Sequence, residues 1–528
     1  MRPFSARGVR GEAAAVLLLG LVILVVASLV MPAGFWVLDE SCRFLQTVSL
    51  SQGLRFPPPV RLASPEVSPV PAHYGYIEDG AVYVQYGPLL ALLALPGWLL
   101  LGEAGAYLPA AAGGACLLAV MYAALRRNGF GALEAFLLPL AGTPVLFYST
   151  TLWSHTLSAA LVAGATVLRK RPVPALIMIG AAALFREEAL VMAPVLLAME
   201  LHRSPRPWKA CLSGVLALVA VFLCGQLILT GSPLGTHIAA SGSELDFYGH
   251  AGRGLLEARL YVLHLSFLSL LPGVQSWASG SAGLLLWLLW AVSRKGGALR
   301  RRLAYAGLAI SGAAALLLLL RGATPFDSFV LKHPLVVFPL LWLVPARRTA
   351  PFGAALLVLL LAMGPMHAED MAWGSRLIQL PLFAACLFAR PGSTSVRRGV
   401  VALGLLTAVA SMALLAGRRA SSARLRNAAA EAGGSVVTTS WILAGDLMPL
   451  TAAGTPVGWA DRGQELAEIM DRLRGSHPVL VAELSRSGPS LAVARAAGFR
   501  PKMVMSVEVD PRLSAGVFEL RPAGTSAR

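Results

Sequence analysis

Residues 13–40 read AAAVLLLGLVILVVASLVMPAGFWVLDE, an apolar run that ends in two adjacent carboxylates, Asp39 and Glu40. A run of about twenty apolar residues is long enough to cross the hydrocarbon core of a bilayer as a helix. Three arginines in the first ten residues precede it, and it is longer than the apolar region of a signal peptide and lacks a convincing cleavage site. We therefore expect a retained anchor with its N-terminus in the cytoplasm, which places both carboxylates outside the cell.

The rest of the chain has the same apolar character. Hydrophobic residues make up 56% of the 528 residues and charged residues only 13%, which one soluble core of this size could not bury. The net charge of +17 does not indicate a nucleic-acid partner, because Lys and Arg fall in short clusters between apolar runs and not along one stripe. The five cysteines show no CxxC spacing, so neither a disulfide framework nor a zinc site is expected. The composition predicts an all-α polytopic protein of the inner (plasma) membrane.

Apolar runs alternate with basic clusters through residues 1–416, and this alternation predicts about thirteen transmembrane helices. Residues 88–102 are expected to lie in the outer interface, because a crossing there would leave Arg126 and Arg127 on the outer face. After the first run, the predicted crossings are 109–125, 131–149, 156–168, 173–185, 189–201, 210–230, 276–293, 304–320, 329–346, 351–366, 377–389 and 399–416.

The first long outer loop, residues 39–85, is rich in proline and carries the acidic pair. Its prolines favour irregular structure, with one short helix expected at about 41–52. A glutamate or aspartate at a helix start also favours the helix through its dipole, so the pair could serve as a cap. Capping and chemistry can coexist at these positions.

A second outer loop, residues 231–258, contains polar groups that could bind a metal. The loop matches no recognisable ligand spacing, so a solvated polar loop is the better interpretation, and no metal or cofactor is expected. The groups considered are His237, Glu244, Asp246 and His250.

The composition of the sequence changes at residue 417. Short buried strands are expected at 436–441 and 478–483, and helices at 463–474 and 491–497. Residues 417–528 are therefore predicted to form a small extracytoplasmic α/β domain beyond the transmembrane domain.

Four arginines at the start of this region, Arg418, Arg419, Arg424 and Arg426, oppose the rule that basic residues stay inside. A terminal exported domain can tolerate them, and anionic lipid headgroups could hold them. The sequence shows no internal repeat, which disfavours transporter folds built from duplicated halves.

The order of these features resembles the GT-C membrane glycosyltransferases, which include the protein mannosyltransferases and the lipid A aminoarabinose transferases. The shared features are the acidic pair in LDE at 38–40, the long outer loop, the interfacial segment that begins QYGPL at 85–89, about thirteen helices and an exported C-terminal domain. Relatives often have two prolines before the Leu of that segment, whereas this chain has Gly87 and Pro88, so the segment is carried over as structure only.

The resemblance implies transfer of a sugar from a polyprenyl-phosphate-linked donor to an extracytoplasmic glycan, lipid or protein acceptor, with inversion at the anomeric carbon. Asp39 matches the catalytic aspartate of the family, and Glu40 completes the candidate catalytic pair. A carboxylate within hydrogen-bond reach of the acceptor supplies a general base, typically worth ~10²–10⁴ in rate.

The leaving phosphate needs a fixed cation on the outer face. Arg376 is the first candidate, because it ends a Gly-x-Arg element that resembles one in some bacterial relatives and because Arg can bind phosphate through two hydrogen bonds. Lys332 is the second, and Arg186 is the third, with adjacent glutamates that could neutralise it. The candidate substrate contacts are Tyr86, His333 and His237.

Two other classes of function remain open. A transporter or flippase should bury ionisable groups at mid-membrane, whereas the charges of this chain gather at the ends of the apolar runs. A polymerase or ligase for lipid-linked glycans would share the donor and the face, and its catalytic groups would lie in a later outer loop such as 231–258.

Overall fold

The structure is a computed structural model that describes most of the two ends of the chain and short stretches of its middle. The described residues are 6–61, 70, 75–78, 81–202, 208–233, 235, 302, 304–309, 312–313, 337–345, 351–356, 358–359, 379–460, 463–473, 477–510 and 513–522. Within the chain, contacts define two compact units. The first comprises residues 1–28, 108–226 and 244–413, and the second comprises residues 29–107, 227–243 and 414–528.

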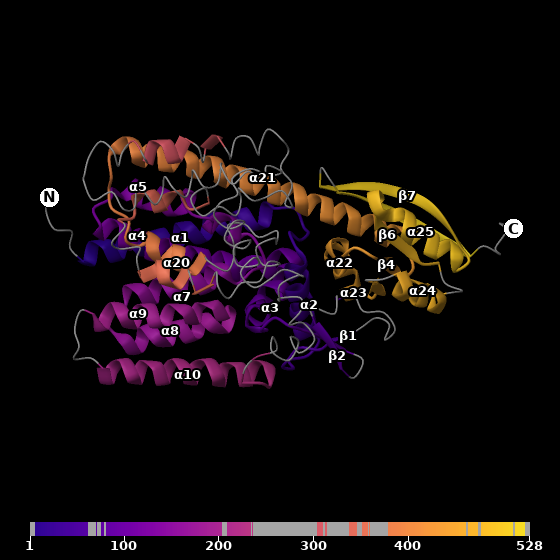
Figure 1. Ribbon diagram of the computed structural model, residues 1–528, viewed down its shortest axis with the longest axis horizontal. Coiled ribbons are helices and arrows are strands. Elements are labelled where there is room, and N and C mark those ends of the chain that lie inside the picture. The colour runs from indigo at the N-terminus through magenta and orange to yellow at the C-terminus, as the bar shows by residue number, and fades with distance from the viewer. Residues whose placement is uncertain are drawn as a thin grey trace, which may run out of the picture. The chain divides into compact units, whose positions relative to one another are not determined.

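The described part of the first unit is helical. Its elements include most of α1 (Ala6–Val30), α4 (Leu108–Arg127), α5 (Ala132–Ala141), α6 (Val145–Ser149), α7 (His155–Val167), α8 (Pro172–Phe185), η3 (Glu187–Val191), α9 (Met192–Leu201), most of α10 (Trp208–Thr230), η7 (Pro339–Leu343), α20 (Gln379–Cys386) and the first half of α21 (Thr394–Ala432). In Figure 1, α7, α8, α9 and α10 run alongside one another.

Small residues allow these helices to approach closely. A Cβ on Gly113 of α4 would lie 2.7 Å from the backbone nitrogen of Leu157 in α7, and one on Gly114 would overlap the Ser149 hydroxyl at the end of α6. Close approach over small residues is the usual way in which helices associate in lipid, where apolar burial gives little drive.

Among the described residues, four helices are long and apolar enough to cross a membrane: Gly8–Val30, Leu89–Arg127, Trp208–Thr230 and Thr394–Ala432. Several predicted crossings coincide with shorter apolar helices, such as α7 for 156–168 and α8 for 173–185. The crossings expected at 276–293 and 304–320 lie wholly or mostly outside the described residues. The count of about thirteen stays a prediction.

The predicted crossing 131–149 is not one continuous helix, because the structure has two helices there. The first, α5, ends at Ala141, and the second, α6, begins after Pro144. Proline has no N–H with which to continue a helix, and the preceding Gly142 caps α5 by donating its N–H to the carbonyl of Leu138.

The second unit begins with the outer loop and its short helix. The elements are α2 (Leu38–Gln52), β1 (Val60–Arg61), β2 (Gly75–Glu78), β3 (Ala81–Val84), α3 (Leu89–Leu101) and η2 (Gly102–Tyr107). The helix expected at 41–52 is present and begins three residues earlier than predicted. The three strands form an antiparallel sheet in the order β1-β3-β2, which the sequence did not predict.

One apolar side of α2 holds this region together. Leu38, Cys42 and Leu45, spaced four and three residues apart, are buried with valines of the small sheet. Met448, from the C-terminal part of the chain, lies in the same cluster. The outer loop therefore shares a core with residues that follow it by several hundred positions.

The C-terminal part of the second unit contains the predicted strands and helices. The elements are the end of α21, β4 (Val436–Thr438), α22 (Trp441–Leu447), α23 (Pro449–Ala452), β5 (Val457–Trp459), α24 (Gly463–Arg472), β6 (Val479–Glu483), η9 (Leu484–Arg486), α25 (Ser487–Ala496), β7 (Phe499–Asp510) and β8 (Leu513–Pro522). The strand order is β5-β4-β6-β8-β7, with β4 parallel to β5 and β6, and with β8 antiparallel to β6 and β7.

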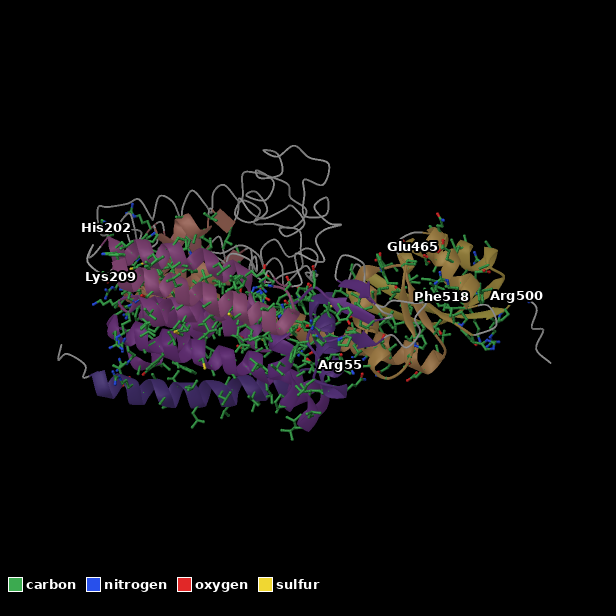
Figure 2. The ribbon with its side chains drawn as sticks, turned by 90° about the horizontal axis from the view of Figure 1, so that it is seen from below. Arg55, His202, Lys209, Glu465, Arg500 and Phe518 are labelled. Atoms are coloured by element: carbon green, nitrogen blue, oxygen red, sulfur yellow. The ribbon has the colours of Figure 1, made fainter. Side chains whose placement is uncertain are left out.

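Two helices, α24 and α25, pack against this sheet and bury a core that includes Phe518 of β8. Glu465 of α24 and Arg500 of β7 are exposed on the surface of this part of the second unit (Figure 2). The long helix α21 runs without a break through residue 417, where the sequence texture changes. The change in composition therefore marks no helix end.

Candidate functional site

The acidic pair lies in the first turn of α2, and both carboxylates are removed from water. Asp39 is 4% exposed and Glu40 is 0% exposed. The carboxylate of Glu40 accepts a hydrogen bond from the backbone N–H of Trp36, four residues earlier. This bond stabilises the turn that leads into α2, and both acids lie where the helix dipole favours negative charge.

Cys42 lies in the same helix, three residues after Asp39. Burial raises the pKa of its thiol well above the usual range, and the charge of Asp39 raises it further, while Arg43 acts in the opposite direction. A buried thiol with a raised pKa stays protonated at neutral pH and is a poor nucleophile. We therefore exclude Cys42 from the candidate catalytic groups.

Arg43 is a buried cation that the sequence analysis did not select. It follows Asp39 by four residues and so lies on the same side of α2, one turn along. Its guanidinium lies over the ring of Tyr86, with 4.9 Å to the ring centroid. The only signal in the sequence was this spacing of four between an acid and a base.

Tyr86, a predicted substrate contact, lies next to α2. Its backbone carbonyl accepts a hydrogen bond of 2.7 Å from the side-chain amide of Gln46. The structure thus brings Tyr86 to the helix that carries the acidic pair. Its role toward a substrate stays a prediction.

Arg186, the third predicted phosphate ligand, belongs to the first unit. Its guanidinium forms an ion pair with Glu188, and the two side chains are 8% and 12% exposed. A neighbouring glutamate therefore neutralises the charge of Arg186, as the sequence suggested.

The remaining predicted site residues lie outside the described residues. They are Arg376, Lys332, His333 and His237, together with the other acidic and histidine residues of the 231–258 loop. Their roles, and the ligase alternative that depends on that loop, stay predictions. Within the described part of the chain, no group of three or more His, Cys, Asp or Glu residues is placed to hold a metal ion.

The arginines that follow residue 417 depart from the charge rule, and no site role was predicted for them from the sequence. In the structure, Arg418 and Arg419 are among the most buried polar side chains of the second unit, at 4% and 1% exposure. Arg418 pairs with Asp446 of α22, and Arg419 lies over the ring of Tyr107 in η2. No local pattern in the sequence identifies those partners.

No family model matches the sequence, and no curated protein matches it. Among solved structures, the chain is similar to ArnT from Cupriavidus metallidurans bound to undecaprenyl phosphate, at 14% identity and a TM-score of 0.46, covering 96% of this chain and 98% of ArnT. The apo state of ArnT gives 14% identity and a TM-score of 0.48, covering 97% of this chain and 98% of ArnT.

The chain is also similar to the archaeal oligosaccharyltransferase AglB from Archaeoglobus fulgidus in complex with an inhibitory peptide and a dolichol-phosphate. That match has 15% identity and a TM-score of 0.39, and it covers 92% of this chain and 72% of AglB.

Proposed function

We propose that this chain is an integral membrane glycosyltransferase that moves a sugar from a polyprenyl-phosphate-linked donor to a glycan, lipid or protein acceptor outside the plasma membrane. The donor class and the inversion are what the sequence resemblance implies. The observation that carries the proposal is the burial of Asp39, a carboxylate that is only 4% exposed in the first turn of α2. Removing a carboxylate from water opposes folding, and such groups concentrate at sites where they react.

The two acids have different tasks in this proposal. The carboxylate of Glu40 accepts a hydrogen bond from the backbone N–H of Trp36 and stabilises the entry to α2. Asp39 is the general base. The acceptor loses its proton to Asp39 while the acceptor oxygen or nitrogen attacks the anomeric carbon from the face opposite the phosphate. The bond from that carbon to the phosphate oxygen breaks, and its electron pair leaves with the polyprenyl phosphate.

The charge that develops on the leaving phosphate requires a cation. Arg376 and Lys332 remain the proposed ligands, with Arg376 first because of its planar pair of donors. Arg186 stays the third candidate, because its charge is already balanced by Glu188.

The first test replaces the base without changing its shape. The full-length Asp39→Asn variant should have a turnover rate ~10²–10⁴-fold below that of wild type. Turnover is measured with a panel of undecaprenyl-phosphate-linked sugars as donors and a membrane extract as acceptor. The matched control is Glu40→Gln, which keeps a carbonyl oxygen to accept the Trp36 N–H and should retain most of the turnover. An Asp39→Asn variant with wild-type turnover would refute Asp39 as the base.

The second test addresses the orientation of the chain, with cysteines introduced at exposed positions and a membrane-impermeant maleimide. Arg55, which follows α2, and Lys209, at the start of α10, are both exposed (Figure 2). Arg55→Cys should be labelled in intact cells, and Lys209→Cys only after the membrane is permeabilised. The opposite pattern would place Asp39 on the cytoplasmic side and overturn the proposed reaction.

A further inference from the structure

We propose that the end of α21 and the short helix α22 position Asp39 for catalysis, so that Arg419, Ser422 and Arg426 of α21 and Gly445 of α22 are positioning residues of the site. This inference rests on the proposed function, because it assumes that Asp39 is the base. It assigns the C-terminal part of the chain a task in the reaction, although that part follows Asp39 by almost four hundred residues.

The first contact is between α21 and the chain just before the acidic pair. Gly34 has a φ of +134°, and a Cβ at this position would overlap the backbone carbonyl of Arg419. The next residue, Phe35, donates its backbone N–H to the hydroxyl of Ser422 at 3.4 Å. Only glycine suits position 34, for both its backbone conformation and the space available. The entry to α2 is thus pressed directly against α21.

The second set of contacts passes through η2. The carboxylate of Glu103 accepts the backbone N–H of Gly34 at 2.7 Å and also pairs with Arg426 at 3.1 Å. The hydroxyl of Tyr107 donates to the carbonyl of Gly34 at 2.9 Å. The guanidinium of Arg419 lies over the same tyrosine ring, 3.9 Å from its centroid. Both hydrogen-bonding groups of the Gly34 backbone are therefore fixed by side chains that α21 holds in turn.

These three residues of α21 occupy one side of the helix. Arg419, Ser422 and Arg426 are separated by three and then four residues, which is the spacing of side chains that share a helix face. All three act on the same two backbone positions, Gly34 and Phe35. We call this set the α21 face.

The third contact reaches the first turn of α2 itself. Arg418 donates from one nitrogen to both carboxylate oxygens of Asp446, at 2.8 and 2.9 Å, which ties α22 to α21. The neighbouring Gly445 accepts a hydrogen bond of 2.6 Å from the hydroxyl of Ser41. A Cβ on Gly445 would lie 3.0 Å from the Cα of Leu38.

Asp39 therefore sits between two residues, Leu38 and Ser41, that both touch Gly445, and it follows the segment that the α21 face holds. A catalytic group must be placed closely, since a displacement of about 1 Å can cost ~10²-fold in rate. Charged groups that are buried and paired fix geometry well, because their separation is strongly unfavourable. The C-terminal part of the chain supplies such paired groups, the buried Arg418 with Asp446 and the partly buried Arg426 with Glu103.

The experiment compares two neighbouring arginines of one helix in the full-length protein. Arg426→Gln removes the partner of Glu103 and should lower kcat roughly tenfold or more, while KM for an undecaprenyl-phosphate sugar stays within about twofold. Arg424→Gln, the matched control, makes the same charge change at an exposed residue that contacts Ser421. It should leave both constants unchanged. Arg426→Lys, which keeps the charge, should recover most of the turnover.

A second pair of variants tests α22 independently. Gly445→Ala inserts a methyl group against Leu38 and should lower kcat, whereas Gly417→Ala places one in open space on α21 and should not. Thermal unfolding of each variant in detergent separates loss of catalysis from loss of the fold: the expected result is a lower kcat at an unfolding temperature within a few degrees of wild type.

The outcomes are distinguishable from those of the proposed function. An inactive Asp39→Asn variant together with fully active Arg426→Gln and Gly445→Ala variants overturns this inference and leaves the proposed base in place. A raised KM for the donor in Arg426→Gln, with kcat unchanged, also overturns it, since the arginine would then bind the donor phosphate directly. An active Asp39→Asn variant removes the premise of both.

Discussion

The helix α21 carries arginine in two different settings. Near its start, in the first unit, Arg397 pairs with Glu134 at 2.9 Å, and the two side chains are 21% and 34% exposed. Near its end, in the second unit, Arg418 pairs with Asp446 at 2.8 Å, and the two side chains are 3% and 1% exposed. The first pair is therefore partly exposed, whereas the second is buried in the interior of the second unit.

This difference accounts for the departure from the charge rule. The rule that basic residues stay on the cytoplasmic side concerns charges that face headgroups and water. Arg418 is neutralised by a buried aspartate, Arg426 by Glu103, and Arg419 lies over an aromatic ring. Three of the four arginines that opposed the predicted topology are therefore poor reporters of it.

The largest effect is expected from breaking the buried pair. Asp446→Asn removes the charge that balances Arg418 and should lower the free energy of unfolding by about 3–5 kcal/mol, because the arginine is left buried without a counter-charge. Chemical denaturation of the full-length protein in detergent measures this loss. A change below about 1 kcal/mol would show that the buried Arg418–Asp446 pair contributes no more to stability than a partly exposed pair.

A double replacement sharpens the same point. Arg418→Met combined with Asp446→Leu removes both charges and fills similar volume, and it should recover much of the stability that Asp446→Asn loses. Recovery indicates that the cost lies in the unpaired charge. If the double variant is as unstable as the single one, the contact geometry of this pair matters more than its charge.

A much smaller effect is expected at the other end of the helix. Glu134→Gln breaks the partly exposed pair with Arg397 and should change the free energy of unfolding by about 0–1 kcal/mol, since water and salt replace the lost partner. Added salt should reduce the difference further. The comparison fails if this variant is as destabilised as Asp446→Asn.

The smallest effect concerns an exposed pair in the C-terminal sheet. The hydrogen bond from Arg521 holds the pKa of the Glu519 carboxyl below its usual value of 4.5. A lowered folded-state pKa gives stability that is present above the unfolded pKa and is lost as the pH falls through the folded one. Wild type should therefore lose its slight advantage in unfolding temperature over Glu519→Gln as the pH falls below 4.5. A difference that does not change with pH would show that this bond contributes nothing.

Local patterns in the sequence predicted local structure well. The helix of the outer loop was placed within three residues of its observed start. The strands β4 and β6 were predicted because each is a short apolar run between turn residues. Likewise, α24 follows from an apolar stripe on a charged helix.

The contacts that hold the candidate site could not be predicted in the same way. The hydrogen bond between Phe35 and Ser422 joins residues 387 positions apart, and the bond between Ser41 and Gly445 joins residues 404 apart. Hydrophobic periodicity tells which side of an element is buried, and it does not identify the element that buries it. For this reason the acidic pair was found from the sequence, whereas the residues around it were found only in the structure.

The unbroken course of α21 sets a rule for changes in its length. A helix turns by about 100° and advances about 1.5 Å with each residue. One residue inserted between Arg419 and Ser422, within the second unit, would turn Ser422 and Arg426 by about 100° relative to Arg419, off the side of the helix that the three residues share. Seven inserted residues would nearly restore the angle while lengthening the rod by roughly 10.5 Å. Natural variation in this stretch should therefore appear as substitution, with insertions and deletions confined to the loops on either side of the helix.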